Sequence, residues 1–200
     1  MKRFLINSFI AAVFITTTSC VNDDDFAIPT LKAGFVENFN EVDFNQNFDY
    51  TGWTNFAEAG TKLWIERDFN DDGYIQFSSF QSGEALNIGW VITPAIDLKG
   101  LVQPVLSFET ASNFVTTASN KIEVFVSSNY DGTNVLAATW TPITAPVANN
   151  STNNYTYIPS GNIDLSAYTG NIHVAFKVTG NGTTQTGLFQ VDKIKVAALN

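Results

Sequence analysis

The chain has 200 residues, a length that suits one domain with short additions at its ends. Hydrophobic residues make up 44% of it and aromatic residues 14%, enough for a packed core, and phenylalanine dominates the aromatic share with 17 residues. The formal net charge of −9 repels phosphate backbones and argues against a nucleic-acid partner. The single cysteine, Cys20, excludes a disulfide framework within the chain and a cysteine-rich zinc site.

Residues 1–19 have the pattern of a signal peptide. Lys2 and Arg3 supply a positive start, and the apolar stretch after them is too short to span a bilayer. Small residues then lead directly to Cys20, an arrangement that resembles the lipobox of bacterial lipoproteins, with Thr17 where that motif often has leucine. We expect cleavage before Cys20 and lipidation of its sulfur, which leaves eight basic residues against nineteen acidic ones, a mature net charge of −11. The alternative is that Cys20 merely ends an ordinary signal peptide.

Residues 20–33 are predicted to be a tether. Asp23, Asp24 and Asp25 follow the cysteine closely, which resembles the acidic stretch of surface-exposed Bacteroidetes lipoproteins, and Pro29 breaks the segment. No later segment has the ~18 apolar residues that a membrane helix needs, so we expect the lipid to be the only anchor. These features predict a protein held at the outer membrane or cell surface, with residues 34–198 as its folded domain.

The domain itself shows the pattern of short, half-buried strands. Apolar residues come in brief runs that mostly alternate with polar ones, turn signals such as Asp131-Gly132 separate the runs, and no segment keeps the 3.6-residue period of a helix. The predicted strands are Phe35–Phe39, Lys62–Glu66, Tyr74–Phe80, Asn87–Thr93, Val105–Thr110, Lys121–Ser127, Asn154–Ile158, Ile172–Val178 and Leu188–Val196. About nine strands joined by turns predict an all-β fold, a β-sandwich of the jelly-roll type.

The segment Asp68–Gly73 allows two interpretations. It matches the first half of an EF-hand calcium loop, but the twelfth position is Ser79 instead of a bidentate acid, and no predicted helices flank it. We therefore expect a hairpin turn in which Asp72-Gly73 supplies the positive φ angles. A weak calcium site is the alternative.

Several landmarks occur in a fixed order along the domain: Phe35–Phe39, Trp53, Trp64, Gly89–Leu98, Ile122–Ser128, Tyr130–Gly132, Ile163–Ser166 and Val191–Val196. Together they resemble the choice-of-anchor J domain, which is related to the cleaved adhesin domains of bacterial surface proteins. The resemblance covers residues 34–197 and implies a jelly roll similar to galactose-binding or MAM-type domains. It implies little about the ligand, because a fold does not set a function. The family's last strand usually carries paired acids, and Lys193 stands in place of the second.

Glu37 and Asp192 each fall at the parity of apolar residues on a predicted strand. A carboxylate on a buried face needs a partner, because burial of an unpaired charge is costly. In related jelly rolls the first and last strands are neighbours and hold a structural calcium ion, so the resemblance implies a Ca2+ site at these two acids, completed by carbonyl oxygens. The alternative is that Lys193, Lys195 or a bulge balances the charge locally.

Trp53, Tyr130 and Trp140 lie near predicted loops and are the candidates for a sugar-stacking surface, because aromatic rings offer flat apolar faces. Core packing is the alternative for each of them. Trp64 and Trp90 are landmarks of the resemblance, and we expect both in the core.

The sequence offers no complete catalytic set. His173 is the only histidine, its parity puts it on the outer strand face, and no local motif supports a triad. Glu41–Gln46 nearly matches an E-x-D-x-x-E pattern of some jelly-roll glycosidases, but Gln46 cannot donate a proton as the acid. We therefore expect a non-catalytic, adhesin-like domain that binds glycans. The alternatives are a structural lipoprotein that binds another envelope protein and, more remotely, a glycoside hydrolase.

Overall fold

The structure, a computed structural model, describes residues 33–198. The predicted signal peptide, Cys20 and the tether up to residue 32 lie outside the described residues. Within residues 33–198, no helix is both long and apolar enough to cross a membrane.

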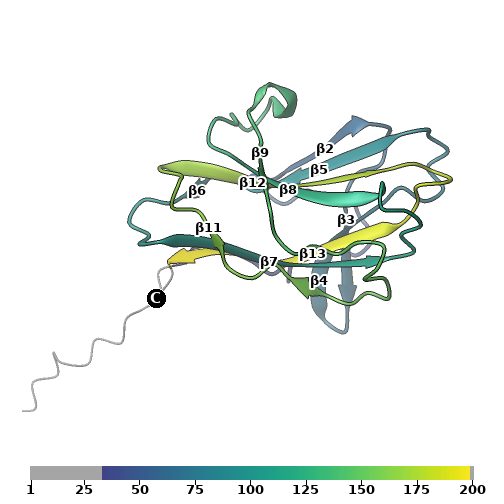
Figure 1. Cartoon of the computed structure of the whole chain (residues 1–200), viewed down its shortest axis with the longest axis horizontal. Helices are drawn as coiled ribbons and strands as arrows, with labels where there is room; N and C mark the ends of the chain where they lie inside the picture. Colours follow the sequence, from purple (N-terminus) through teal and green to yellow (C-terminus); the bar gives the residue numbers. More distant parts are fainter. Residues whose placement is uncertain (1–32, 199–200) are drawn as a thin grey trace, which may run out of the picture. The chain divides into compact units, whose positions relative to one another are not determined.

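Two antiparallel sheets form the domain (Figure 1). The seven-stranded sheet has the order β10-β7-β13-β4-β3, with β1 beside β13 and β11 beside β7; the six-stranded sheet has the order β2-β5-β12-β8-β9, with β6 beside β12. The strands are β1 Ala33–Glu37, β2 Thr54–Ala59, β3 Ile65–Phe69, β4 Asp72–Ser78, β5 Asn87–Ile92, β6 Ile96–Asp97, β7 Pro104–Asn113, β8 Lys121–Ser127, β9 Thr141–Ile143, β10 Ile158–Pro159, β11 Ile163–Asp164, β12 Asn171–Gly180 and β13 Leu188–Ala198. One short 3-10 helix, η2 (Val135–Ala137), interrupts them. The predicted all-β sandwich is confirmed.

The main core lies between the two sheets. On β12 the side chains that alternate inward, from Ile172 to Val178, are at most 1% exposed, as the period-two pattern predicts. Phe176 on this strand meets Phe108 of β7 edge-on, with ring centroids 5.1 Å apart. This contact joins the two sheets directly, because each ring comes from a different layer.

β13 is the central strand of the seven-stranded sheet. It pairs with β7 along one side and with β4 and then β1 along the other. A bulge lies between Asp192 and Lys195, where Lys193 adopts a φ of 52°. Val191 before the bulge and Ile194 after it both point into the core, so the extra residue keeps the apolar side chains inward at the cost of regular alternation.

Most predicted strands are present, and β8 has the predicted bounds. The prediction missed β2, whose sequence TNFAEA has one large apolar residue and whose side chains are all half-buried at a sheet edge. The predicted strand Asn154–Ile158 is wrong apart from Ile158. Asn154 and Tyr155 have φ angles of 86° and 58°, so the chain turns where an extended strand was expected.

The segment Asp68–Gly73 is a hairpin turn between β3 and β4, as expected. The positive φ angles fall on Asn70 (56°) and Asp71 (62°), so the prediction that Asp72-Gly73 supplies them is wrong. Gly73 is required for a different reason. A Cβ at this position would overlap the carbonyl oxygen of Phe39, which crosses close to β4.

Gly89 makes a comparable close approach inside the core. It lies on β5, and a Cβ there would overlap the ring of Phe77, which β4 contributes from the opposite sheet. We expect Gly89→Ala to lower the free energy of unfolding by about 1–3 kcal/mol, because the ring has no free space into which to move. Denaturant unfolding measures this change.

The control is a double-mutant cycle with Phe77→Leu, which removes the outer ring atoms. The combined variant should lose less stability than the sum of the two single variants. Strictly additive losses would contradict the proposed overlap.

Candidate functional site

A small aromatic cluster covers part of the outer face of the six-stranded sheet. Segment 128–140 leaves β8, forms η2 and folds back over this face. We call the result the Trp90 cluster; its residues are Phe56, Ile88, Trp90, Ile92, Phe125, Tyr130, Val135, Ala138, Trp140 and Ala175. The ring centroid of Trp90 lies 5.4 Å from that of Phe125 and 5.5 Å from that of Trp140.

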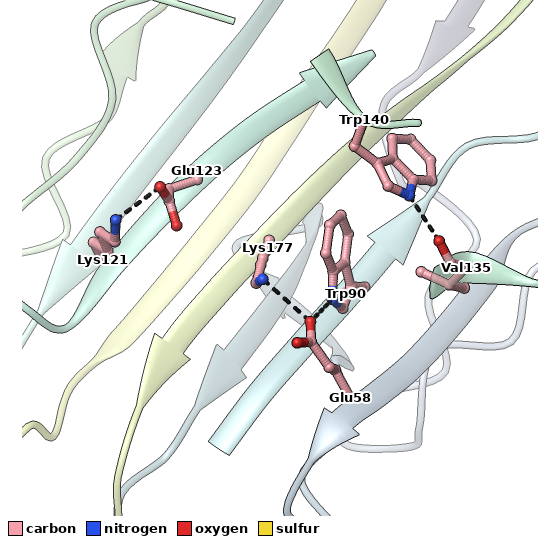
Figure 2. A network of polar contacts seen from close by, with 7 residues as sticks. All are labelled: Glu58, Trp90, Lys121, Glu123, Val135, Trp140 and Lys177. Atoms are coloured by element: carbon pink, nitrogen blue, oxygen red, sulfur yellow. Dashed lines mark hydrogen bonds and ion pairs between the residues drawn. The ribbon is translucent and has the colours of Figure 1, made fainter. Parts of the chain in front are cut away.

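Both indole N–H groups of the Trp90 cluster are bonded within the protein (Figure 2). Trp90 Nε1 donates to Glu58 Oε2 over 2.7 Å, and Trp140 Nε1 donates to the Val135 carbonyl over 2.9 Å. Lys177 completes the arrangement, with its Nζ 3.1 Å from Glu58 Oε2 and 4.7 Å from the centroid of the Trp90 ring. The ring contacts of Trp140 with Trp90 and of Tyr130 with His173 hold segment 128–140 on the sheet, and the hydrogen bonds use groups that a ligand would otherwise contact.

The three predicted ligand-binding aromatics separate in the structure. Tyr130 and Trp140 come together, with ring centroids 5.5 Å apart, but Tyr130 is 7% exposed, so its expected place on the surface is wrong. The reason is the turn at Asp131, whose carboxylate accepts bonds from the backbone N–H groups of Thr133 and Asn134 and sends the chain back over the sheet. Trp53 lies elsewhere, packed at the edge of the main core against Phe48.

The landmark tryptophans and the histidine are where the sequence predicts them. Trp64 is 0% and Trp90 is 4% exposed, so both are buried as expected. His173 lies on the outer face of β12, half-buried, with Nδ1 2.8 Å from the carbonyl oxygen of Thr93. Its ring also meets Tyr130 edge-on, so it is part of the packing of segment 128–140.

An open cleft lies on the outer face of the other, seven-stranded sheet. It has a volume of about 590 Å³. We call it the tyrosine cleft; its aromatic walls and its floor are formed by Phe44, Phe69, Tyr74, Tyr155, Tyr157, Gln76 and Gln190. Phe69 and Tyr155 are 71% and 45% exposed, so their rings are accessible to a ligand.

Two glutamines form the floor of the tyrosine cleft. Gln76 of β4 and Gln190 of β13 are direct cross-strand partners, and Gln190 Nε2 donates to Gln76 Oε1 over 3.1 Å. A carboxamide has two donor protons and an acceptor oxygen, so each side chain keeps further bonding capacity. The mutual bond fixes their orientation. Gln190 is 2% exposed, so the half-buried amide of Gln76 is the one that a polar ligand can reach.

Charged and phenolic groups line the sides of the cleft. The guanidinium of Arg67 lies 4.6 Å from the centroid of the Phe44 ring, and its Nη1 donates to Asn45 Oδ1 over 2.9 Å. Burial, with a further contribution from the Asp192 carboxylate, raises the pKa of Tyr157 above its ordinary value. Tyr157 therefore stays protonated at neutral pH.

Glu37 and Asp192, the predicted calcium ligands, are not brought together. Glu37 pairs with Ile194, whose side chain points into the core, whereas Asp192 pairs with Glu109 on the outer face. The bulge at Lys193 is the cause, because it shifts the alternation of β13 between Asp192 and Ile194. The expected convergence of the two carboxylates is therefore wrong.

The charge of Asp192 is balanced locally by Lys193, which was the alternative to a calcium site. Its side chain is 2% exposed, it accepts a bond from the Lys193 backbone N–H over 2.6 Å, and Lys193 Nζ lies 3.7 Å from its carboxylate. The same Nζ lies 3.4 Å from Glu109 and 3.7 Å from Asp72. Lys193, which replaces the expected second acid, thus neutralises part of an acidic group on the outer face. Calcium binding at either predicted acid stays a prediction.

Glu37 instead lines an acidic pocket of about 500 Å³ with Glu41, Asp43, Asp49 and Glu66. Burial, followed by the charge of Glu41, raises the pKa of Glu37. Across residues 33–198, no three acidic, histidine or cysteine side chains are grouped in a way that could hold a metal ion. The carboxylate of Glu66 is held by the backbone N–H of Asp43, so part of this acidic group serves to fix the segment after β1.

Sequence reasoning missed the tyrosine cleft, although part of its signal was present. Along β4, Tyr74, Gln76 and Ser78 alternate with the core residues Ile75 and Phe77, so a face of aromatic and amide side chains is readable from the period. The walls carry no such signal, because Tyr155 and Phe44 come from irregular segments whose positions depend on the tertiary fold.

These features define an all-β sandwich domain with an aromatic cleft on one outer face. Residues 66–200 match the family model described as Domain of unknown function (DUF5017), and the chain belongs to that family. A comparison with curated protein sequences gives no match.

Three solved structures are among those to which this chain is similar. The K1 cleaved adhesin domain of Lys-gingipain from Porphyromonas gingivalis W83 is 19% identical, with a TM-score of 0.50 over 83% of this chain and 98% of that one. The K3 cleaved adhesin domain of the same protein is 15% identical, with a TM-score of 0.53 over 84% and 99%. TmCBM27, a carbohydrate-binding module with specific mannan recognition, is 9% identical, with a TM-score of 0.48 over 85% and 99%. The likeness to the two adhesin domains shows a shared fold, and identities this low leave the ligand open.

The Asp192 carboxyl predicts a pH-dependent stability. Burial raises its pKa to about 6 from the ordinary 3.8. The contribution of this group to stability is complete below pH 4 and is lost as the pH rises through 6, because the folded state must then bury a charge. Asp192→Asn should therefore raise the free energy of unfolding by about 1–3 kcal/mol at pH 7.5 and change it little at pH 4.

Thermal unfolding of both proteins at the two pH values measures this difference. The matched control is Asp72→Asn, an exposed acid that lies at the same 3.7 Å from Lys193 and should change the stability little. A loss of stability in Asp192→Asn at pH 7.5 would mean that the contact with Lys193 outweighs the cost of burial.

Proposed function

We propose that this protein is a non-catalytic, glycan-binding module of the cell surface, and that the glycan binds in the tyrosine cleft. The observation that carries the proposal is the composition of this cleft. Accessible rings from three separate segments surround a floor of two oriented carboxamides. Sugar rings have both apolar C–H faces and hydroxyl groups, and the cleft offers a partner to each.

The physical basis is that the walls of the cleft offer apolar contact and its floor offers hydrogen bonds. Tyr155 and Phe69 offer apolar faces against which the C–H groups of a pyranose ring can pack. Gln76 offers a donor and an acceptor whose orientation the bond from Gln190 sets before a ligand arrives, which lowers the entropic cost of binding. The protonated hydroxyl of Tyr157 adds a donor on the same side.

The polar side chains of the tyrosine cleft support a function of binding without catalysis. Amides and phenols hold a sugar without supplying the acid and the base or nucleophile of glycoside hydrolysis. Asp72, one of the acids at the cleft, lies 3.7 Å from Lys193 and so already has an ionic partner within the protein.

The location and anchor belong to the same proposal. The lipobox-like sequence before Cys20 supports export and attachment to the outer membrane through a lipid, followed by a short acidic tether. The similarity of fold to cleaved adhesin domains agrees with a surface location. Assignment to the choice-of-anchor J group stays a prediction.

A second candidate function is contact with another envelope protein. Leu136 is 65% exposed on segment 128–140, and Trp140, four residues further along the same segment, is partly exposed. An exposed apolar side chain on a projecting loop suits a protein partner. This surface lies on the sheet opposite the tyrosine cleft, so the two functions can be tested separately.

The test is a glycan array with the folded domain, followed by calorimetry on the ligand that binds. We expect Tyr155→Ala and Gln76→Ala each to weaken binding about tenfold or more, because each removes one contact from the centre of the site. Trp140→Ala is the matched control, an aromatic removed from the other sheet, and should leave the Kd unchanged.

Two results would contradict the proposal. A silent array with correctly folded protein would remove the glycan function. Loss of binding in Trp140→Ala with none in Tyr155→Ala would move the site to the Trp90 cluster.

A further inference from the structure

A second cavity lies on the same sheet face as the tyrosine cleft. It has a volume of about 570 Å³. We call it the apolar compartment; its apolar lining consists of Phe80, Phe114, Val115, Gly187 and Leu188. Phe80 and Phe114 are 57% and 66% exposed, which is unusual for side chains of this size unless they serve a contact.

The same two strands form the floor of both cavities. Along β4, Gln76 belongs to the tyrosine cleft and Ser78 to the apolar compartment; along β13, Gln190 and Leu188 divide in the same way. Leu188 pairs with Ser78, as Gln190 pairs with Gln76. Because side chains two residues apart on a strand share one face, these four side chains form a continuous floor.

The walls are also continuous. Tyr155 lines the tyrosine cleft and Phe114 lines the apolar compartment, and their rings meet edge-on with centroids 6.3 Å apart. The floor from Tyr74 to Ser78 spans five residues of β4, or about 13 Å for four steps at the strand rise of ~3.3 Å per residue. This length exceeds that of a disaccharide, so a linear chain that fills the cleft reaches the apolar compartment.

The polar side chains around the apolar compartment are already used. Ser78 Oγ donates to the Gly187 carbonyl over 3.2 Å, and Thr116 Oγ1 donates to the Thr184 carbonyl over 3.0 Å. Asn153 bonds both the N–H and the carbonyl of Val115. The compartment therefore offers a ligand mainly apolar contact, in contrast to the amides of the cleft.

We propose that the tyrosine cleft and the apolar compartment form one groove for a linear glycan in which one sugar unit carries a methyl-bearing substituent, an N-acetyl group or a 6-deoxy carbon, that enters the apolar compartment. This inference rests on the proposed function and names its ligand class. A methyl group gains from transfer out of water into the space between Phe80, Phe114 and Leu188. A hydroxymethyl or hydroxyl group at the same place would lose its hydrogen bonds to water without replacement.

The experiment compares matched pairs of linear oligosaccharides. The probes are cellotetraose and the tetramer of N-acetylglucosamine, which share a β-1,4 backbone, and pairs of hexose and 6-deoxyhexose oligosaccharides of equal linkage. In at least one pair, we expect the methyl-bearing member to bind wild-type protein about three- to tenfold more tightly. Tetramers should also bind more tightly than the corresponding dimers, because dimers do not span the groove.

Phe114→Ala tests the place of the methyl group. We expect this variant to bind both members of a pair equally, because the advantage of the methyl-bearing member depends on its contact with this ring. Leu136→Ala, an exposed apolar side chain on the other sheet, is the matched control and should retain the preference. Circular dichroism checks that each variant is folded.

The outcomes separate this inference from the proposed function. Tyr155-dependent binding with no preference within any pair overturns the inference and leaves the glycan function standing. No binding to any oligosaccharide overturns both. Phe114-dependent binding to phosphatidylcholine vesicles, without glycan preference, would assign the compartment to a lipid and also overturn the inference.

Discussion

The constraint on which the core and the outer face of the seven-stranded sheet depend is the alternation of inward and outward side chains along β13. This strand lies at the centre of the seven-stranded sheet, so its inward residues must be apolar and its outward residues decide what that face offers. Phe189 and Val191 point inward, which puts Gln190 on the floor of the tyrosine cleft. The bulge at Lys193 then resets the alternation, so that the core continues and Asp192 stays outside it.

The two sheets use their outer aromatic residues differently. On the six-stranded sheet, the indole N–H groups of Trp90 and Trp140 are bonded to the protein itself, and the rings hold segment 128–140 in place. On the seven-stranded sheet, the rings of Tyr155 and Phe69 remain accessible above two oriented amides. Aromatic content alone does not distinguish these cases; the partners of the polar atoms do, because a group already bonded within the protein has little to offer a ligand.

The fold was largely predictable and the site only in part. The strands with strong alternation, such as β8 and β12, follow from the period of apolar residues because one face of each is buried against the opposite sheet. β2 escaped prediction because an edge strand with a single large apolar residue gains its pairing from β5 rather than from its own pattern. The calcium argument at Glu37 and Asp192 counted parity along an uninterrupted strand, and the bulge at Lys193 invalidated the count.

The sequence by itself determined the class of fold, the burial of Trp64 and Trp90 and the placement of His173 on an outer face, because these follow from local periodicity and from landmark order. Only the tertiary structure decided that Tyr130 is buried, that Glu37 and Asp192 separate, and that Tyr155 stands beside Phe114 above β4 and β13. The physical reason is that a cleft is made of side chains brought together from distant segments. Their contacts depend on loop paths and on one bulged residue, neither of which leaves a periodic signal in the chain.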